Sequence, residues 1–236
     1  MTPITFAHRG ARAEEPENTL AAFRRALELG AGGLETDAWL SADGQVVLVH
    51  DDVVRRGLRR MRVAGTAADQ LARHGVPRLA DLYGELGSDY ELSIDVKDRA
   101  AAVPILELAG ARSVAERLWL CSPSLRFLRE LREQNRAGAH LVHSTGRRHL
   151  SQPLERHAAD LAADGIAVMN MHHSEWTAGL VTLFHRFEVR AFAWDVQEVR
   201  HIRAVLAMGI DAVYSDHVDR MVATVSEFAR GDRSER

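Results

Sequence analysis

The sequence predicts an α/β fold, a (β/α)8 TIM barrel in a single domain with a β-hairpin extension after the second strand. Three observations support this fold. Eight short apolar runs recur along the 236 residues, helix-like segments lie between them, and no Gly-x-Gly-x-x-Gly turn follows the first run. Strands that alternate with helices pair in parallel through right-handed crossovers. A doubly wound open sheet is the alternative, but its glycine-rich turn is missing.

The eight runs are expected to form the barrel strands. In chain order they cover residues 4–8, 33–39, 90–96, 117–121, 139–143, 166–170, 189–194 and 211–215. Between them, apolar residues recur at the spacing of a helix with one buried face. The first expected helix contains Leu20, Phe23 and Leu27, and the others cover residues 78–87, 102–116, 123–136, 152–164, 175–187, a segment from Val199 to Leu206, and 219–230.

The first helix has recognisable ends. Asn18 can accept a backbone N–H as its N-cap, and it could alternatively serve as a hydrogen-bond donor in an active site. Gly30 can take the left-handed conformation that ends a helix. We expect the barrel to cover residues 1–230 and residues 231–236 to form a disordered tail.

A ninth apolar run, residues 45–49, follows the second strand too closely for a helix to intervene. Asp43-Gly44 between alternating residues indicates a two-residue type I′ hairpin turn. With that turn Asp37 would pair directly with His50, and Glu35, two residues before Asp37, would share their face. A slip of one residue would move His50 to the opposite face.

Composition excludes several classes of partner. The formal charge is −3 and no block of like charges occurs, so we expect no nucleic-acid partner. No stretch of about 18 apolar residues is present, and residues 1–10 do not resemble a signal peptide, so we expect no stable membrane insertion and a cytoplasmic protein. The single cysteine, Cys121, is expected to be a buried apolar residue.

Charged side chains gather at the predicted carboxyl ends of three strands, which meet at the mouth of a barrel. Three of them are acids, Glu35, Asp37 and Asp95. Three carboxylates in one place need a cation, and hard divalent ions take carboxylate oxygens. We therefore expect these acids to be metal ligands for one Mg²⁺ or Ca²⁺ ion.

The remaining groups at the mouth suit a phosphate ester. Arg9 and Lys97 supply fixed positive charge for phosphate oxygens. His8 and His50 could act as acid and base on either side of a phosphorus atom. Trp194 ends a strand and could either pack on a substrate or close the barrel core. The pattern predicts metal-assisted cleavage of a phosphate ester.

Residues 7–52, AHRGARAEEPENTLAAFRRALELGAGGLETDAWLSADGQVVLVHDD, resemble the glycerophosphodiester phosphodiesterase family in order and spacing. Weaker similarities continue in VPRLADLYGEL, SIDVK, AFAWDVQ and MGIDAVYSD. The resemblance implies a (β/α)8 barrel that hydrolyses small glycerophosphodiesters to sn-glycerol 3-phosphate and an alcohol. It also implies that Glu35, Asp37 and Asp95 hold the metal and that His8 and His50 exchange protons. Asp95 stands where most of the family carries the longer Glu.

Two alternatives remain open at this stage. A phospholipase D-like enzyme acting on lysophospholipids would use the same scaffold, although no amphipathic segment for an acyl chain is evident. A non-catalytic barrel that binds phosphorylated ligands is the other alternative, although all five candidate catalytic and metal residues are present. His172 and His173 are interpreted as a solvated loop pair. The alcohol leaving group and the oligomeric state are not predicted.

Overall fold

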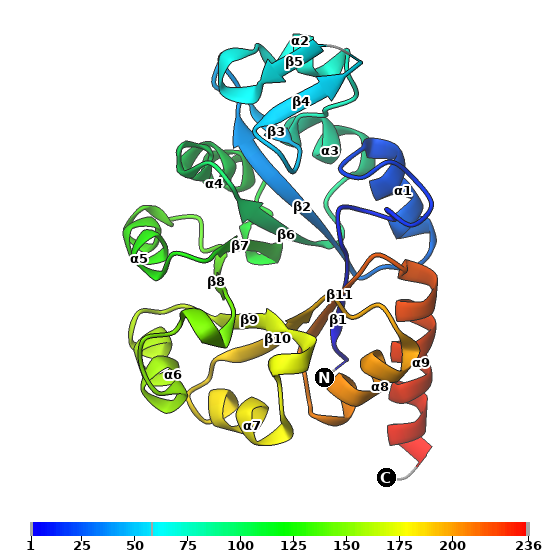
Figure 1. Cartoon of the computed structure of the whole chain (residues 1–236), viewed down its shortest axis with the longest axis vertical. Coiled ribbons are helices and arrows are strands. Elements are labelled where there is room, and N and C mark those ends of the chain that lie inside the picture. The colour runs from blue at the N-terminus through cyan, green and yellow to red at the C-terminus, as the bar shows by residue number, and fades with distance from the viewer. Residues whose placement is uncertain (1, 58, 235–236) are drawn as a thin grey trace.

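Eight parallel strands close into a barrel because the first strand pairs with both the second and the last (Figure 1). The computed structural model describes residues 2–57 and 59–234. The barrel strands are β1 (Ile4–Ala7), β2 (Gly33–Leu40), β6 (Glu91–Val96), β7 (Leu118–Ser122), β8 (His140–Ser144), β9 (Val168–His172), β10 (Arg190–Trp194) and β11 (Ala212–Ser215). Each lies within two residues of a run identified in the sequence, which confirms the predicted fold class.

Helices surround the barrel and cover its outer face (Figure 1). They are α1 (Leu20–Glu28), α3 (Leu79–Leu86), α4 (Ala102–Ala111), α5 (Leu125–Gln134), α6 (Leu154–Ala163), α7 (Ala178–Arg186), α8 (Val199–Ala207) and α9 (Val218–Ser234). The helical backbone of α9 extends through Gly231 to Ser234, further than the sequence pattern indicates, and residues 235–236 lie outside the described part. None of the helices described is long and apolar enough to cross a membrane.

Aromatic side chains fill the interior of the barrel. Phe6 stacks on Tyr214 with ring centroids 4.7 Å apart, and Trp119 lies 5.2 Å from Phe192. A Cβ atom on Gly33 would lie 2.7 Å from the Phe6 ring, so only glycine allows this ring to fit against β2. Tyr214 also lines a cavity at the carboxyl ends of the barrel strands, so the aromatic cluster forms the floor of this cavity.

The hairpin after β2 forms, but its predicted register is wrong by one residue. β3 (Val46–Leu48) pairs with β2 so that Ala38 lies opposite Leu48, and Asp37 O accepts a hydrogen bond from Val49 rather than facing His50. The loop has three residues, since Ser41 N donates to Gln45 O at 2.9 Å and closes it. Within the loop only Gly44 adopts positive φ, at 75°, and its N–H donates to Ser41 O. His50 follows β3 in a bend, which returns it to the cavity despite the shift.

A second hairpin, which the sequence analysis missed, lies beyond this one and outside the barrel (Figure 1). It consists of β4 (Val53–Arg56) and β5 (Arg59–Arg62) and is followed by the short helix α2 (Ala68–Ala72). A small core of its own holds it, formed by Val47, Val54, Val63, Ala68, Leu71 and Val76. Its strands are rich in arginine, so the apolar run that marked the barrel strands is absent from them.

The first helix begins one residue later than predicted. Thr19, not Asn18, is the N-cap, and its hydroxyl accepts a hydrogen bond from Ala22 N at 3.2 Å. Asn18 has φ 56° and is 3% exposed, so its side chain points inward. Gly30 adopts the predicted left-handed conformation after the helix, with φ 88°.

Candidate active site

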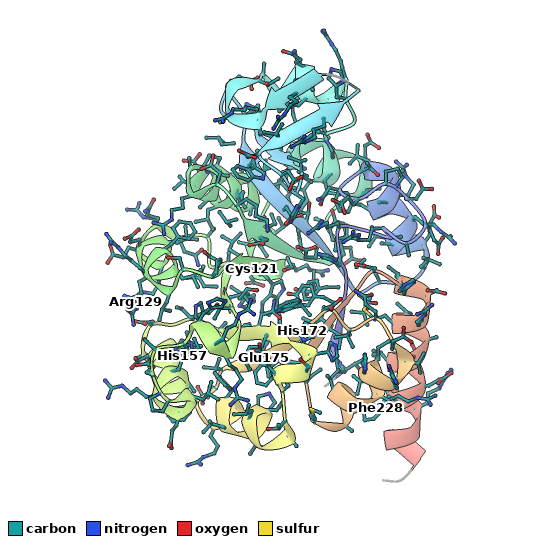
Figure 2. The ribbon with its side chains drawn as sticks, viewed as in Figure 1. Cys121, Arg129, His157, His172, Glu175 and Phe228 are labelled. Atoms are coloured by element: carbon teal, nitrogen blue, oxygen red, sulfur yellow. The ribbon has the colours of Figure 1, made fainter. Side chains whose placement is uncertain are left out.

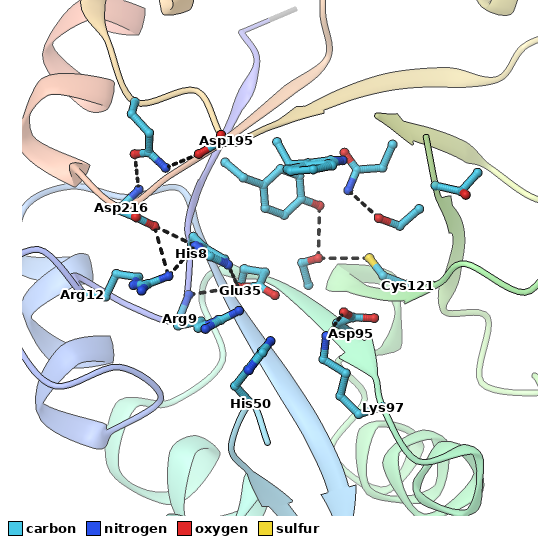
Figure 3. A pocket seen from close by; sticks show the side chains of 17 residues that line it. His8, Arg9, Arg12, Glu35, His50, Asp95, Lys97, Cys121, Asp195 and Asp216 are labelled. Atoms are coloured by element: carbon cyan, nitrogen blue, oxygen red, sulfur yellow. Dashed lines mark hydrogen bonds and ion pairs between the residues drawn. The ribbon is translucent and has the colours of Figure 1, made fainter. Parts of the chain in front are cut away.

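A cavity of about 500 Å³ opens at the carboxyl ends of the barrel strands (Figure 3). Seven of the eight residues predicted for the site line it: His8, Arg9, Glu35, His50, Asp95, Lys97 and Trp194. The eighth, Asp37, lies directly behind the wall with a side chain that is 2% exposed. The barrel thus brings together residues that are up to 186 positions apart in the chain, from His8 to Trp194.

His8 is held from two sides by carboxylates. Its Nδ1 lies 2.7 Å from Asp216 Oδ1, and its Nε2 lies 3.8 Å from Glu35 Oε2 (Figure 3). Burial, the largest single effect, lowers the pKa of His8, but Glu35 and the hydrogen bond to Asp216 together outweigh it, so the net pKa is raised. The Asp216 contact therefore fixes the ring orientation and favours the charged imidazole.

The turn after His8 binds Glu35 through the backbone. Arg9 and Gly10 both have positive φ, 54° and 80°, and this turn directs Arg9 N to Glu35 Oε2 at 2.9 Å. Gly10 cannot be replaced without strain, because a Cβ there would lie 2.7 Å from the Ala22 backbone. The conformation of His-Arg-Gly thereby links β1 to the acid on β2.

The acids face the same interior from neighbouring strands. Glu35 and Asp37 are two residues apart on β2 and therefore share one face of the strand, and Asp37 is paired in register with Asp95 on β6. Burial, together with the charges of Asp37 and Asp95, raises the pKa of Glu35 to about 7. Burial also raises the pKa of Asp95, although Lys97 opposes this. A buried carboxyl group with a raised pKa is fully charged near neutral pH only where an additional positive charge stabilises its charged form.

Asp37 is enclosed by cationic and amide groups. Its Oδ2 lies 3.1 Å from Arg9 Nε and accepts a hydrogen bond from Asn18 Nδ2 at 3.0 Å, while its Oδ1 lies 3.1 Å from Lys97 Nζ. Lys97 Nζ also binds Asp95 Oδ2. Asn18 in turn accepts a hydrogen bond from Thr36 Oγ1 at 2.7 Å, so it positions the acid, the second of its two predicted roles.

The chemistry of the acids fits a hard divalent cation. Carboxylate oxygens of Glu35 and Asp95 line the cavity, and Asp37 lies next to both of them. A cation bound to Asp37 would share this carboxylate with Arg9 and Lys97, which contact it in the present arrangement. Glu35 and Asp95 are therefore the acids most accessible to the ion.

His50 lines the same cavity as His8, on the chain that follows β3 (Figure 3). Its Nδ1 lies 2.8 Å from Asp51 Oδ1, and the side chain is 38% exposed. In both histidines, therefore, Nδ1 lies at hydrogen-bond distance from a carboxylate, and Nε2 is the ring nitrogen that remains for proton transfer. That pairing is the arrangement by which proteins orient an imidazole for proton transfer.

The opposite wall and the floor are less charged. Trp194 is 39% exposed at the end of β10 and lines the cavity, so it does not close the barrel core. At the floor, Ser93 Oγ lies 3.1 Å from Tyr214 OH and 3.3 Å from Cys121 Sγ. Cys121 is buried as predicted, but it lies in this polar cluster, and burial raises the pKa of its thiol.

Two further residues of the site were missed in the sequence. Asp216 follows the last strand in YSDH, where a lone acid gave no signal until the closure of β1 on β11 placed it beside His8. Gln197 Oε1 accepts hydrogen bonds from Asp216 N at 2.9 Å and Ser215 Oγ at 3.0 Å, which fixes the position of that acid. For Gln197, the available signal in the sequence was the Asp-Val-Gln that directly follows Trp194.

Comparison with known proteins identifies the family of the chain. The model of the glycerophosphoryl diester phosphodiesterase family matches residues 8–220. A glycerophosphodiester phosphodiesterase of Caldanaerobacter subterraneus is 24% identical over 95% of this chain and 98% of its own length.

Two solved structures share the fold. A glycerophosphodiester phosphodiesterase from Thermotoga maritima has a TM-score of 0.83 at 24% identity, covering 94% of this chain and 98% of its own. A phosphodiesterase from Oleispira antarctica, in complex with the product sn-glycerol 3-phosphate, has a TM-score of 0.78 at 20% identity and covers 95% and 97%. The chain therefore belongs to the glycerophosphodiester phosphodiesterase family.

Proposed function

We propose that this protein hydrolyses small glycerophosphodiesters to sn-glycerol 3-phosphate and an alcohol, with one divalent metal ion, Mg²⁺ or Ca²⁺, and with His8 and His50 as the proton-transfer groups. The observation that carries the proposal is the pair of histidines at one cavity, each with Nδ1 on a carboxylate. Membership of the family supports the substrate class.

In the proposed reaction one histidine removes the proton from the glycerol 2-hydroxyl, whose oxygen then attacks phosphorus. The bond from phosphorus to the alcohol oxygen breaks, and the other histidine protonates the departing alcohol. Water then opens the cyclic phosphate with the histidine roles reversed, which regenerates both groups and yields glycerol 3-phosphate. Arg9 and Lys97 line the cavity as cations and would bind the phosphate oxygens.

Glu35, Asp37 and Asp95 would hold the metal ion, and the ion would offset the negative charge that develops on the phosphate oxygens. The raised pKa values of Glu35 and Asp95 support this assignment, since a nearby cation favours their charged forms. Asp95 is one methylene shorter than glutamate, and Lys97 already contacts it. We propose that Asp95 nevertheless contributes to the cation site.

The direct test measures release of glycerol 3-phosphate from glycerophosphocholine by the purified protein. We expect turnover with Mg²⁺ or Ca²⁺ and none after chelation. His8→Ala and His50→Ala should each lower kcat roughly 10²- to 10⁴-fold, the range for general acid–base groups. If His50→Ala retained the wild-type kcat, the proposed proton transfer would be wrong.

A matched control is available at the other end of the barrel. His185 Nε2 lies 2.7 Å from Asp211 Oδ2, a contact as short as that of His8 with Asp216. Asp211, however, directly precedes β11, whereas Asp216 directly follows it. His185→Ala should therefore leave kcat unchanged. Lysophosphatidylcholine serves as a second substrate, because product from it alone would favour a lipid-directed enzyme, whereas no product from either diester would contradict the proposed activity.

A further inference from the structure

A histidine-rich cluster lies on the cavity rim, away from the three acids. His172 ends β9, His173 follows it, and Asp195 follows β10. Among residues 2–57 and 59–234, these three form a group in which one ligand atom from each lies within 4.8 Å of the others. Figure 2 shows His172 over the barrel, whereas Phe228 lies on the outer helix α9.

We propose that His172, His173 and Asp195 form a second metal site, which takes a transition-metal dication of the zinc class. Two imidazole nitrogens and one carboxylate oxygen are typical ligands of zinc, iron, nickel and copper, whereas Mg²⁺ and Ca²⁺ prefer oxygen ligands. Three protein ligands also leave a coordination position for water or a ligand. In this proposal His172 and His173 are ligands rather than the solvated loop pair that the sequence suggests.

The shortest contact in the group identifies where the ion would bind. His172 Nε2 lies 3.1 Å from Asp195 Oδ2, so a hydrogen bond joins the imidazole to the carboxylate. A metal ion would take the place of the proton in that hydrogen bond, since ligand imidazoles bind metals in their deprotonated form. The second ring nitrogen, Nδ1, accepts a hydrogen bond from Ser174 N at 3.3 Å and lies 2.7 Å from Ser174 Oγ, so contacts with Ser174 fix the orientation of the ring.

Neighbouring aromatic rings hold both imidazoles in place. Trp194 packs edge-on against His172 with ring centroids 4.7 Å apart. His201 on α8 stacks on His173 with centroids 4.4 Å apart and an interplanar angle of 26°.

The carboxylate is also held by a hydrogen bond. Asp195 has φ 60°, in the left-handed region that Asp and Asn adopt more readily than most other residues. Its second oxygen, Oδ1, accepts a hydrogen bond from Gln197 Nε2 at 3.1 Å, which leaves Oδ2 directed to His172. Because Asp195 and Trp194 line the cavity, the bound ion would lie at its rim, on the wall opposite the acids.

The site can be tested by titrating Zn²⁺ into the purified protein in excess Mg²⁺, which occupies the carboxylate site. Calorimetry should show one zinc ion bound per chain. His172→Ala, His173→Ala and Asp195→Asn should each weaken zinc binding at least about 10-fold, as loss of a ligand or its support does. Cobalt offers a second readout, because its visible absorption should change on binding to the wild type and not to His172→Ala.

His185→Ala is the control, since it removes a more exposed histidine outside the cluster, 40% against 27% for His172, and should leave zinc affinity unchanged. Equal zinc affinity in the wild type and in all three cluster variants would overturn the proposal, as would displacement of zinc by Mg²⁺. Thermal unfolding of each variant verifies that the fold is retained. Because the readout is metal binding, failure of this site is distinguishable from failure of the proposed hydrolysis.

Discussion

Replacing Asp216 by asparagine should slow the reaction without removing the histidine that performs it. Asp216 Oδ1 lies 2.7 Å from His8 Nδ1, and an asparagine at this position would keep the size of the side chain while removing its charge. A hydrogen bond with a charged partner contributes about 1.5–3 kcal/mol. If the hydrogen bond stabilises the transition state by this amount because it orients His8 for proton transfer, its loss should lower kcat about 10- to 150-fold.

The assay for Asp216→Asn is release of glycerol 3-phosphate at saturating metal, with kcat and KM determined separately. We expect the loss in kcat rather than in KM, because Asp216 contacts His8, the proposed proton-transfer group. Asp211→Asn is the matched control, since Asp211 binds His185 at the opposite end of the barrel. A wild-type kcat for Asp216→Asn would refute the orienting role of this acid.

The structure supports three further predictions. Asn18→Ala removes the hydrogen bond to Asp37 inside the protein, so its free energy of unfolding in urea should fall by about 1–3 kcal/mol, and an unchanged value would contradict the role of Asn18. Burial lowers the pKa of His143 from 6.5 to about 4. As pH falls below 6.5, the unfolded chain protonates this histidine before the folded chain does, so the free energy of unfolding decreases. At pH 5 this loss is about 2 kcal/mol, and His143→Gln should abolish it in urea unfolding measured at pH 7 and pH 5. Trp194→Ala should raise KM for glycerophosphocholine about 2- to 30-fold, the value of a cation–π contact, with little change for glycerophosphoglycerol; equal effects on both would exclude headgroup contact.

The barrel and most of its mouth could be predicted because they depend on local patterns. Buried parallel strands read as apolar runs, and their carboxyl ends all meet at one rim. His8, Glu35, Asp95 and Lys97 each lie at or directly after such a run, so their shared location follows from the strand assignment alone.

The errors arose where a single backbone or side-chain contact decides the structure. The Asp-Gly pair predicts a two-residue turn, but Ser41 Oγ donates to Asp43 Oδ1 at 2.6 Å and accepts from Gln45 N at 2.9 Å, which stabilises the longer loop. Asp43 also accepts a hydrogen bond from Ala68 N, a partner 25 residues away. A pattern limited to neighbouring residues does not contain that contact, so the register shifted by one.

Asp216 illustrates a different limit. Its importance depends on closure of the barrel, which brings it to His8 across 208 positions of the chain. The acid itself occupies an ordinary position after a short strand, in a sequence with 33 acidic residues, so only the three-dimensional structure distinguishes it.

The most direct test of the account is a crystal structure of the protein with Ca²⁺ and sn-glycerol 3-phosphate. We expect the ion on the carboxylates of Glu35, Asp37 and Asp95, with the phosphate between His8 and His50 and near Arg9. A phosphate bound elsewhere, with no ion at those acids, would contradict it.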